Sequence, residues 1–157
     1  MWVTAYVDAS FSRAHGGGWA VWLRCALGRL VRRGPCPPYV RDSTAAELAA
    51  IFAAVHLAAT RWPGRVRGVL VRGDCQGALA LADPQAALTR NAGLRTLQQK
   101  LRATTAQHAI TLECRWVRGH QAPSGGTSAF LNDACDRLAR RARKARAAPR
   151  PRTEPGR

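Results

Sequence analysis

Four carboxylates stand where strand-like segments end or helix-like segments begin. The 157-residue sequence has only nine Asp and Glu against 25 Lys and Arg, so the position of each acid is informative. The four are Asp8 near the end of the first strand-like segment, Glu47 in the first turn of the first long helical segment, Asp74 after a buried strand-like segment and Asp136 near the start of the last helical segment. Strand ends and helix starts are where an open α/β sheet gathers its functional groups, so we expect the four side chains to converge.

Converging carboxylates predict a site for hard divalent cations. Four negative charges held together repel one another unless cations lie between them, and Mg²⁺ prefers oxygen ligands. Two such ions, about 3.5–4 Å apart, can bind the attacking water and the leaving oxygen of a phosphodiester. We therefore expect two Mg²⁺ ions, with Mn²⁺ as the alternative metal, and hydrolysis of a nucleic-acid backbone.

Each of these acids also has a purely structural interpretation. Asp8 and Asp74 could form turns at strand ends, and Asp136 could be a favourable charge in a first helical turn. Glu47 lies three residues after Thr44, which is the spacing of a capping box. The remaining acids are interpreted structurally: Asp42 and Asp83 as caps or turns, Glu113 on an outer strand face, Asp133 as a surface charge or a supporting neighbour of the site, and Glu154 in the tail. A structural interpretation of all four site acids requires four coincidences, which favours the metal site.

The charge balance indicates a polyanionic partner. The formal net charge is +16, and a field of this size attracts polyanions and releases their counterions on binding. Residues 137–157 carry nine of the positive charges against one acid, Glu154. A general solubility function is the alternative interpretation of this charge.

The segments that must position the acids alternate between strand and helix patterns. We expect strands at 2–11 and 19–23, a shorter third strand that begins at 30–31, and strands at 66–71 and 110–117. We expect helices at 45–62, 76–82, 91–107 and from Leu131 onward. Glycines at 16–18 predict a turn, and prolines in 34–38 are expected to end the third strand because proline cannot donate to a ladder. The order predicts an α/β fold with a five-stranded mixed sheet, strands 1–3 antiparallel, flanked by helices. Residues 1–147 would form one catalytic domain and residues 148–157, rich in Arg and Pro, a disordered tail.

The five cysteines favour free thiols. Their number is odd and no pair has Cys-x-x-Cys spacing, so neither a disulfide framework nor a zinc site is expected. Buried thiols suit a reducing compartment, and we expect a cytoplasmic protein. We expect no membrane association.

Five stretches, in order along the chain, resemble type 1 ribonuclease H. They are Tyr6-Val7-Asp8-Ala9-Ser10, residues 44–50 (TAAELAA), residues 71–76 (VRGDCQ), Trp116-Val117-Arg118-Gly119-His120 and residues 132–139 (NDACDRLA). The resemblance implies a ribonuclease H-like fold and an endonuclease that hydrolyses the RNA strand of RNA–DNA hybrids, leaving 5′-phosphate and 3′-hydroxyl ends. It also implies a monomer without an obligate protein partner.

The resemblance assigns roles to individual residues. Asp8, Glu47, Asp74 and Asp136 would be the metal ligands, and His120 would assist proton transfer or product release. Asn132 would contact the RNA strand near its 2′-hydroxyls, which is how a protein tells RNA from DNA. The other expected substrate contacts are Ser10, Ser43, Thr44 and Gln76.

Two departures from the family pattern affect substrate binding. Ala9 stands where the family commonly has glycine, which lets backbone approach the substrate closely. The chain also lacks the Trp-containing basic helix that some relatives insert between Asp74 and the fifth strand. We expect the Arg-rich segment 137–157 to compensate for it. A non-catalytic, basic nucleic-acid-binding protein on the same fold is the alternative function.

Overall fold

The computed structural model describes residues 1–118 and 126–147. Residues 119–125 and 148–157, and with them the predicted tail, lie outside the described part. The strands are β1 (Trp2–Ser12), β2 (Gly16–Cys25), β3 (Gly28–Pro35), β4 (Gly68–Gly73) and β5 (Thr111–Trp116). The helices are α1 (Ser43–Arg61), α2 (Gln76–Ala82), α3 (Ala92–Gln107) and α4 (Gly126–Ala147).

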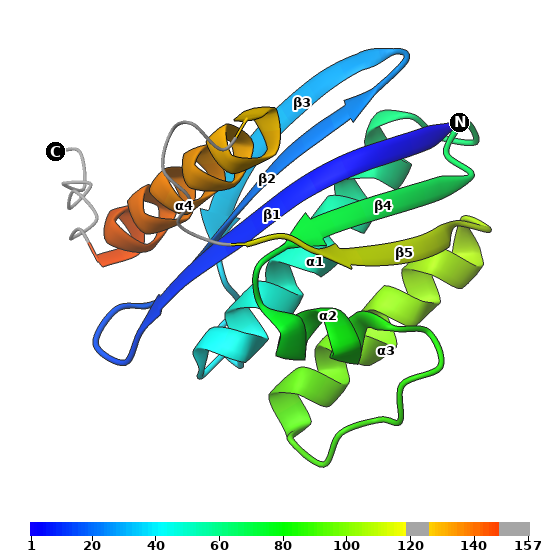
Figure 1. The fold of residues 1–157 in the computed structure, drawn as a ribbon. Coiled ribbons are helices and arrows are strands. Elements are labelled where there is room, and N and C mark those ends of the chain that lie inside the picture. Colours follow the sequence, from blue (N-terminus) through cyan, green and yellow to red (C-terminus); the bar gives the residue numbers. More distant parts are fainter. Residues whose placement is uncertain (119–125, 148–157) are drawn as a thin grey trace, which may run out of the picture.

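The strands form one mixed sheet in the order β3-β2-β1-β4-β5 (Figure 1). β1, β2 and β3 form an antiparallel meander, and β4 and β5 run parallel to β1. This arrangement confirms the predicted five-stranded sheet. It places β1 at the centre, next to both an antiparallel and a parallel neighbour, so Asp8 on β1 lies close to the end of β4, where Asp74 follows.

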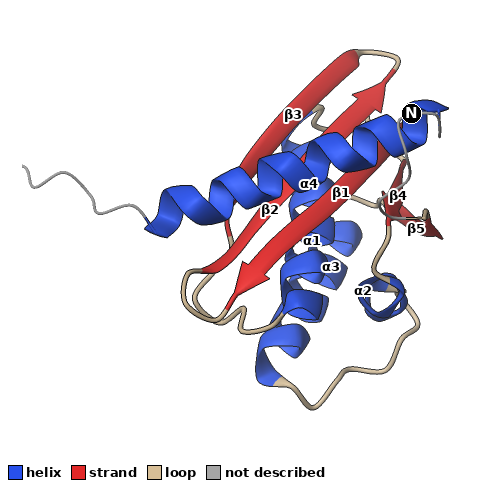
Figure 2. Cartoon of the chain, turned by 60° about the vertical axis from the view of Figure 1, so that its left-hand side comes forward, coloured by secondary structure: helices blue, strands red, loops and turns tan. Residues whose placement is uncertain are grey.

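Helices cover the two faces of the sheet unequally. α1, α2 and α3 lie on one face, and α4 crosses the other (Figure 2). Alternate residues of β1 explain the two layers: Val3, Ala5 and Val7 pack in the core under α1, whereas Tyr6 packs with Leu131 of α4. Among the described helices only α1 is long and apolar enough to cross a membrane, but 61% of that window is buried inside the protein, as in a core helix.

The glycine run 16–18 is not a turn, contrary to the sequence prediction. Gly17 and Gly18 pair with β1 inside strand β2. A Cβ on Gly18 would lie 2.4 Å from the backbone nitrogen of Arg143, so glycine is needed here because α4 lies directly against the strand. The sequence shows the glycines but not the helix that requires them.

Other boundaries also differ from the prediction. β3 continues through Pro35, which an edge strand tolerates because its outer side has no ladder to complete. α4 begins at Gly126, five residues before the predicted start at Leu131. All five cysteines are free, as predicted.

Candidate active site

Three of the four predicted carboxylates converge directly. One oxygen from each of Asp8, Glu47 and Asp74 lies within 4.8 Å of the others. Asp8 comes from the middle of β1, Asp74 follows the end of β4, and Glu47 lies in α1, which packs on β1. Asp136, on α4, is close enough to act electrostatically on Asp8. Four elements of secondary structure therefore bring the four acids to one place.

Glu47 is not a capping residue, so the capping-box interpretation is wrong. The N-cap of α1 is Asp42, whose Oδ1 accepts a hydrogen bond from the Ala45 amide at 2.7 Å. Glu47 instead accepts from the Ala9 amide, at 3.2 Å, through Oε1. The same amide donates to Asp8 Oδ1 at 2.7 Å. The Ala9 amide thus holds two of the site carboxylates side by side.

The site disfavours negative charge when no cation is bound. Burial, and then the charges of Asp74 and Asp136, raise the pKa of Asp8 to about 7. Burial, and then Asp8 and Asp74, raise the pKa of Glu47 to about 9. A hydrogen bond between the two carboxyls lowers the pKa of Asp8 and raises that of Glu47, so the pair shares a proton when no cation is bound. A positive charge at this point would release that proton and ionise both groups.

The donor set fits a hard divalent cation. Carboxylate oxygens are the ligands that Mg²⁺ and Mn²⁺ prefer, and Mg²⁺ usually combines one or two protein carboxylates with waters and substrate phosphates. The three oxygens within 4.8 Å of one another match that chemistry, and the burial and neighbouring carboxylates that raise the pKa of Asp8 and Glu47 favour a bound positive charge.

Asp136 has a partner that sequence reasoning missed. Arg140 Nε donates to Asp136 Oδ1 at 2.8 Å, one helical turn further along α4. Asp136 is only 15% exposed, so this guanidinium supplies the neutralising charge on its side of the site. The spacing of four residues on a helix was the available signal. Asp133 forms an exposed ion pair with Arg137 instead, as expected of a surface charge.

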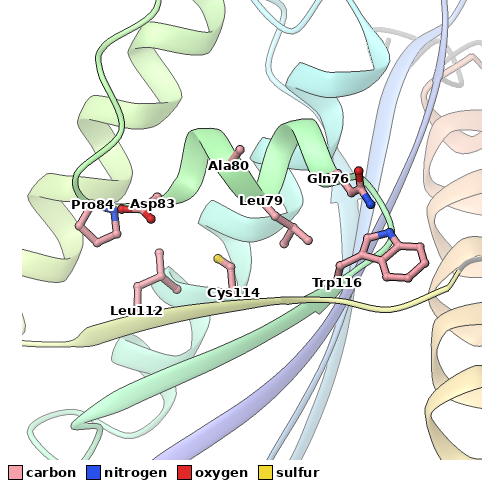
Figure 3. Close-up of a pocket in the computed structure, with 8 residues that line it drawn as sticks. All are labelled: Gln76, Leu79, Ala80, Asp83, Pro84, Leu112, Cys114 and Trp116. Atoms are coloured by element: carbon pink, nitrogen blue, oxygen red, sulfur yellow. The ribbon is translucent and has the colours of Figure 1, made fainter.

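Trp116 anchors the loop that carries Asp74. Its indole Nε1 donates to the Asp74 carbonyl at 3.0 Å, although the ring is 49% exposed. Trp116 and Gln76 stand together at one end of a cavity of about 410 Å³ between α2 and β5 (Figure 3). None of the four site carboxylates lines this cavity, so it lies beside the acidic site and is not part of it.

The comparison with protein families identifies the family of the chain. The family model described as RNase H matches residues 2–144. The chain belongs to the RNase H family. A search of curated protein sequences gave no match to this chain.

Solved structures of RNase H proteins share the fold. The N-terminal RNase H domain of Rv2228c from Mycobacterium tuberculosis is 18% identical, with a TM-score of 0.66 over 93% of this chain and 96% of that one. RNase H1 from Halobacterium salinarum is 23% identical, with a TM-score of 0.63 over 92% and 99%. LC11-RNase H1, solved in complex with an RNA/DNA hybrid, is 14% identical, with a TM-score of 0.72 over 93% and 99%.

Most substrate-contact candidates of this RNase H lie near the carboxylates. Ser10 follows Asp8 on the same side of β1, and its side chain is partly exposed. Ser43 and Thr44 begin α1, and Gln76 begins α2. A Cβ on Gly77 would lie 3.8 Å from Thr44 Cγ2, so the starts of the two helices are neighbours.

The two remaining candidates differ from these. Asn132 is only 3% exposed, and its Oδ1 has no hydrogen-bond partner among the described residues. A contact with RNA would therefore require a local movement at the start of α4. His120 lies outside the described residues.

Proposed function

We propose that this RNase H hydrolyses the RNA strand of RNA–DNA hybrids as a metal-dependent endonuclease. The convergence of Asp8, Glu47 and Asp74 oxygens within 4.8 Å carries the proposal. The family match over residues 2–144 supports a nuclease, and a structural neighbour bound to an RNA/DNA hybrid supports the substrate. The products would be 5′-phosphate and 3′-hydroxyl ends.

The four carboxylates would hold two Mg²⁺ or Mn²⁺ ions. When bound, such ions supply an activated water and stabilise the departing 3′ oxygen. The residues of the chain have separate tasks around them. The Ala9 amide fixes Asp8 and Glu47 in place, and Trp116 holds the Asp74 backbone. Arg140 balances Asp136 until the site is loaded.

Substrate recognition would use the residues around this cluster. Ser10, Ser43, Thr44 and Gln76 would contact the hybrid, and Asn132 the RNA strand. His120 would assist proton transfer or product release. The net charge of +16 would attract the duplex, and ionic contacts with phosphates make such binding strongly salt-dependent. We further propose that the protein is cytoplasmic and works as a monomer. Light scattering of the purified protein would test the oligomeric state.

A panel of end-labelled substrates tests the proposed activity. RNA–DNA hybrid, single-stranded RNA, double-stranded RNA and double-stranded DNA are incubated with the protein and Mg²⁺ or Mn²⁺. We expect cutting of the hybrid alone, within the RNA strand, with 5′-phosphate ends that a ligase accepts. Tight hybrid binding without cutting in either metal would favour the alternative of a non-catalytic nucleic-acid-binding protein.

A further inference from the structure

The face of the sheet that carries α4 is only partly covered. Side chains of paired residues in adjacent strands point to the same face, so the pairs Tyr6–Trp22 and Tyr6–Arg72 form one row across β2, β1 and β4. Thr4 and Arg24 form the next row toward the start of β1. α4 packs against β1, β2 and β3, and no described helix lies in front of β4 and β5 (Figure 1). These rows therefore border an open part of the sheet.

Two cavities make this region a groove. One, of about 490 Å³, is lined by Trp2, Tyr6 and Arg72, and the other, of about 660 Å³, by Trp22, Arg29 and Phe130. Both share Arg24, Cys25, Ala26 and Leu131. Shared walls join them into one depression at the start of α4, which we call the sheet groove. Neither cavity includes any of the four site carboxylates.

Trp2 offers a flat ring to this groove. Three consecutive ring carbons, Cε3, Cζ3 and Cη2, would each lie 2.6 Å from a Cβ on Gly68. A point equally distant from three consecutive ring atoms lies on the ring axis, so the six-membered ring covers Gly68 face-on. Trp2 is nevertheless 48% exposed, because its opposite face points away from the sheet. Phe130, at the other end of the groove, is 59% exposed.

The charge of the sheet groove is positive. Arg24, Arg29 and Arg72 line it, and Arg72 lies over the Tyr6 ring at 5.7 Å. No acid among the described residues lines either cavity. Exposed aromatic rings among arginines are the combination that binds unpaired bases, since bases stack on the rings while guanidinium groups hold the phosphates.

We propose that the sheet groove binds single-stranded nucleic acid, separately from the carboxylate site. A paired duplex has no free base faces to stack on these rings, so an unpaired strand is the occupant that fits the chemistry. Tyr6 is two residues from Asp8 on β1, a separation of about 7 Å along the strand. A single-stranded extension of a hybrid could therefore occupy the groove while the hybrid lies at the carboxylates. Binding to the groove itself does not depend on the proposed hydrolase activity.

Fluorescence anisotropy tests the proposal with the intact chain in EDTA, which removes the divalent metal that the proposed hydrolysis requires. The probes are labelled 12-nucleotide oligo(dT) and oligo(U), with a 12-base-pair duplex as competitor. We expect Trp2→Ala to weaken oligonucleotide binding by about fivefold or more, the effect typical of losing one stacked base. Arg24→Glu should also weaken binding, because it replaces a charge that attracts phosphates by one that repels them. Gly68→Ala should act in the same direction without changing charge, because its Cβ displaces the Trp2 ring.

Matched substitutions on the other side of the sheet serve as controls. Arg90→Glu makes the same charge change in the exposed segment before α3, and Leu88→Ala removes an apolar side chain that is 44% exposed. Both variants should bind the oligonucleotides like the unchanged protein. Thermal melting monitored by circular dichroism would check that every variant is folded. Equal binding by groove and control variants would overturn the proposal. A second result would also overturn it: the unchanged protein is a dimer, and Phe130→Ala dissociates the dimer without affecting oligonucleotide binding. The groove would then be a contact between two copies of the chain.

Discussion

Replacing Asp8 by Asn should stabilise the metal-free protein at alkaline pH. Because burial and neighbouring acids raise the folded-state pKa of Asp8 from 3.8 to about 7, the folded protein binds more protons than the unfolded chain between these values. The contribution of Asp8 to stability is therefore greatest below about pH 4, and it is lost as the pH rises through this window. Asn cannot ionise, and its Oδ1 can still accept the hydrogen bond from the Ala9 amide.

The size of this effect follows from the two pKa values. One pKa unit corresponds to ~1.36 kcal/mol, so ionised Asp8 costs the folded protein about 4 kcal/mol at pH 8. At pH 5, which is only about one unit above the pKa of the unfolded carboxyl, the same cost is below about 2 kcal/mol. The variant should thus gain more than twice as much at pH 8 as at pH 5.

Urea denaturation in EDTA, followed by tryptophan fluorescence at both pH values, measures this difference. Asp133→Asn is the matched control, because Asp133 is exposed and pairs only on the surface with Arg137. It should change stability by less than about 1 kcal/mol at either pH. Added Mg²⁺ should stabilise the unchanged protein and narrow its gap to Asp8→Asn. An Asp8→Asn gain that is the same at pH 5 and pH 8, or a loss at pH 8, would refute the electrostatic reasoning.

Three further predictions concern the surroundings of the site. Trp116→Phe keeps an aromatic ring but removes the donor to the Asp74 carbonyl, so hybrid cleavage should fall about tenfold while the melting temperature changes little. Arg140→Ala removes the exposed partner of Asp136. Half-maximal thermal stabilisation should then require up to about fivefold less Mg²⁺. A higher requirement would show that the arginine supports metal binding. Deletion of the residues after Ala147 removes three arginines, and the slope of log affinity for hybrid against log salt should become shallower; an unchanged slope would exclude a contribution of the tail.

The sequence predicts the sheet and the acidic cluster because both depend on local patterns. Alternation along β1 and the glycines soon after it predict the antiparallel meander, although the turn itself precedes the glycines. The position of Asp74 directly after a buried strand predicts a place next to Asp8. The role of Glu47 was ambiguous in the sequence, since capping and metal ligation require the same position near the start of a helix. The hydrogen bond from Ala9, which is distant in sequence, decides between them.

Features that depend on contacts between distant segments could not be predicted. From the sequence alone Gly18 resembles a turn residue, and only the structure shows α4 packed against it. Trp116 likewise resembles an ordinary strand residue, and only the structure shows its indole bound to the Asp74 carbonyl. The exposed ring of Trp2 likewise depends on Gly68 in another strand. Each case joins residues more than 40 positions apart, beyond the range of helical or strand periodicity.

The most direct test of the central claim is hybrid cleavage by the unchanged protein, Asp74→Asn and Asp133→Asn over a range of Mg²⁺ concentrations. We expect Asp74→Asn to lose more than about 100-fold in rate while still binding the hybrid, because loss of a direct ligand exceeds the 10–100-fold typical of supporting residues. Asp133→Asn should cleave like the unchanged protein, and EDTA should stop all cleavage. Cleavage by Asp74→Asn at the unchanged rate, or cleavage that persists in EDTA, would contradict the assignment of the carboxylate cluster as a metal-dependent active site.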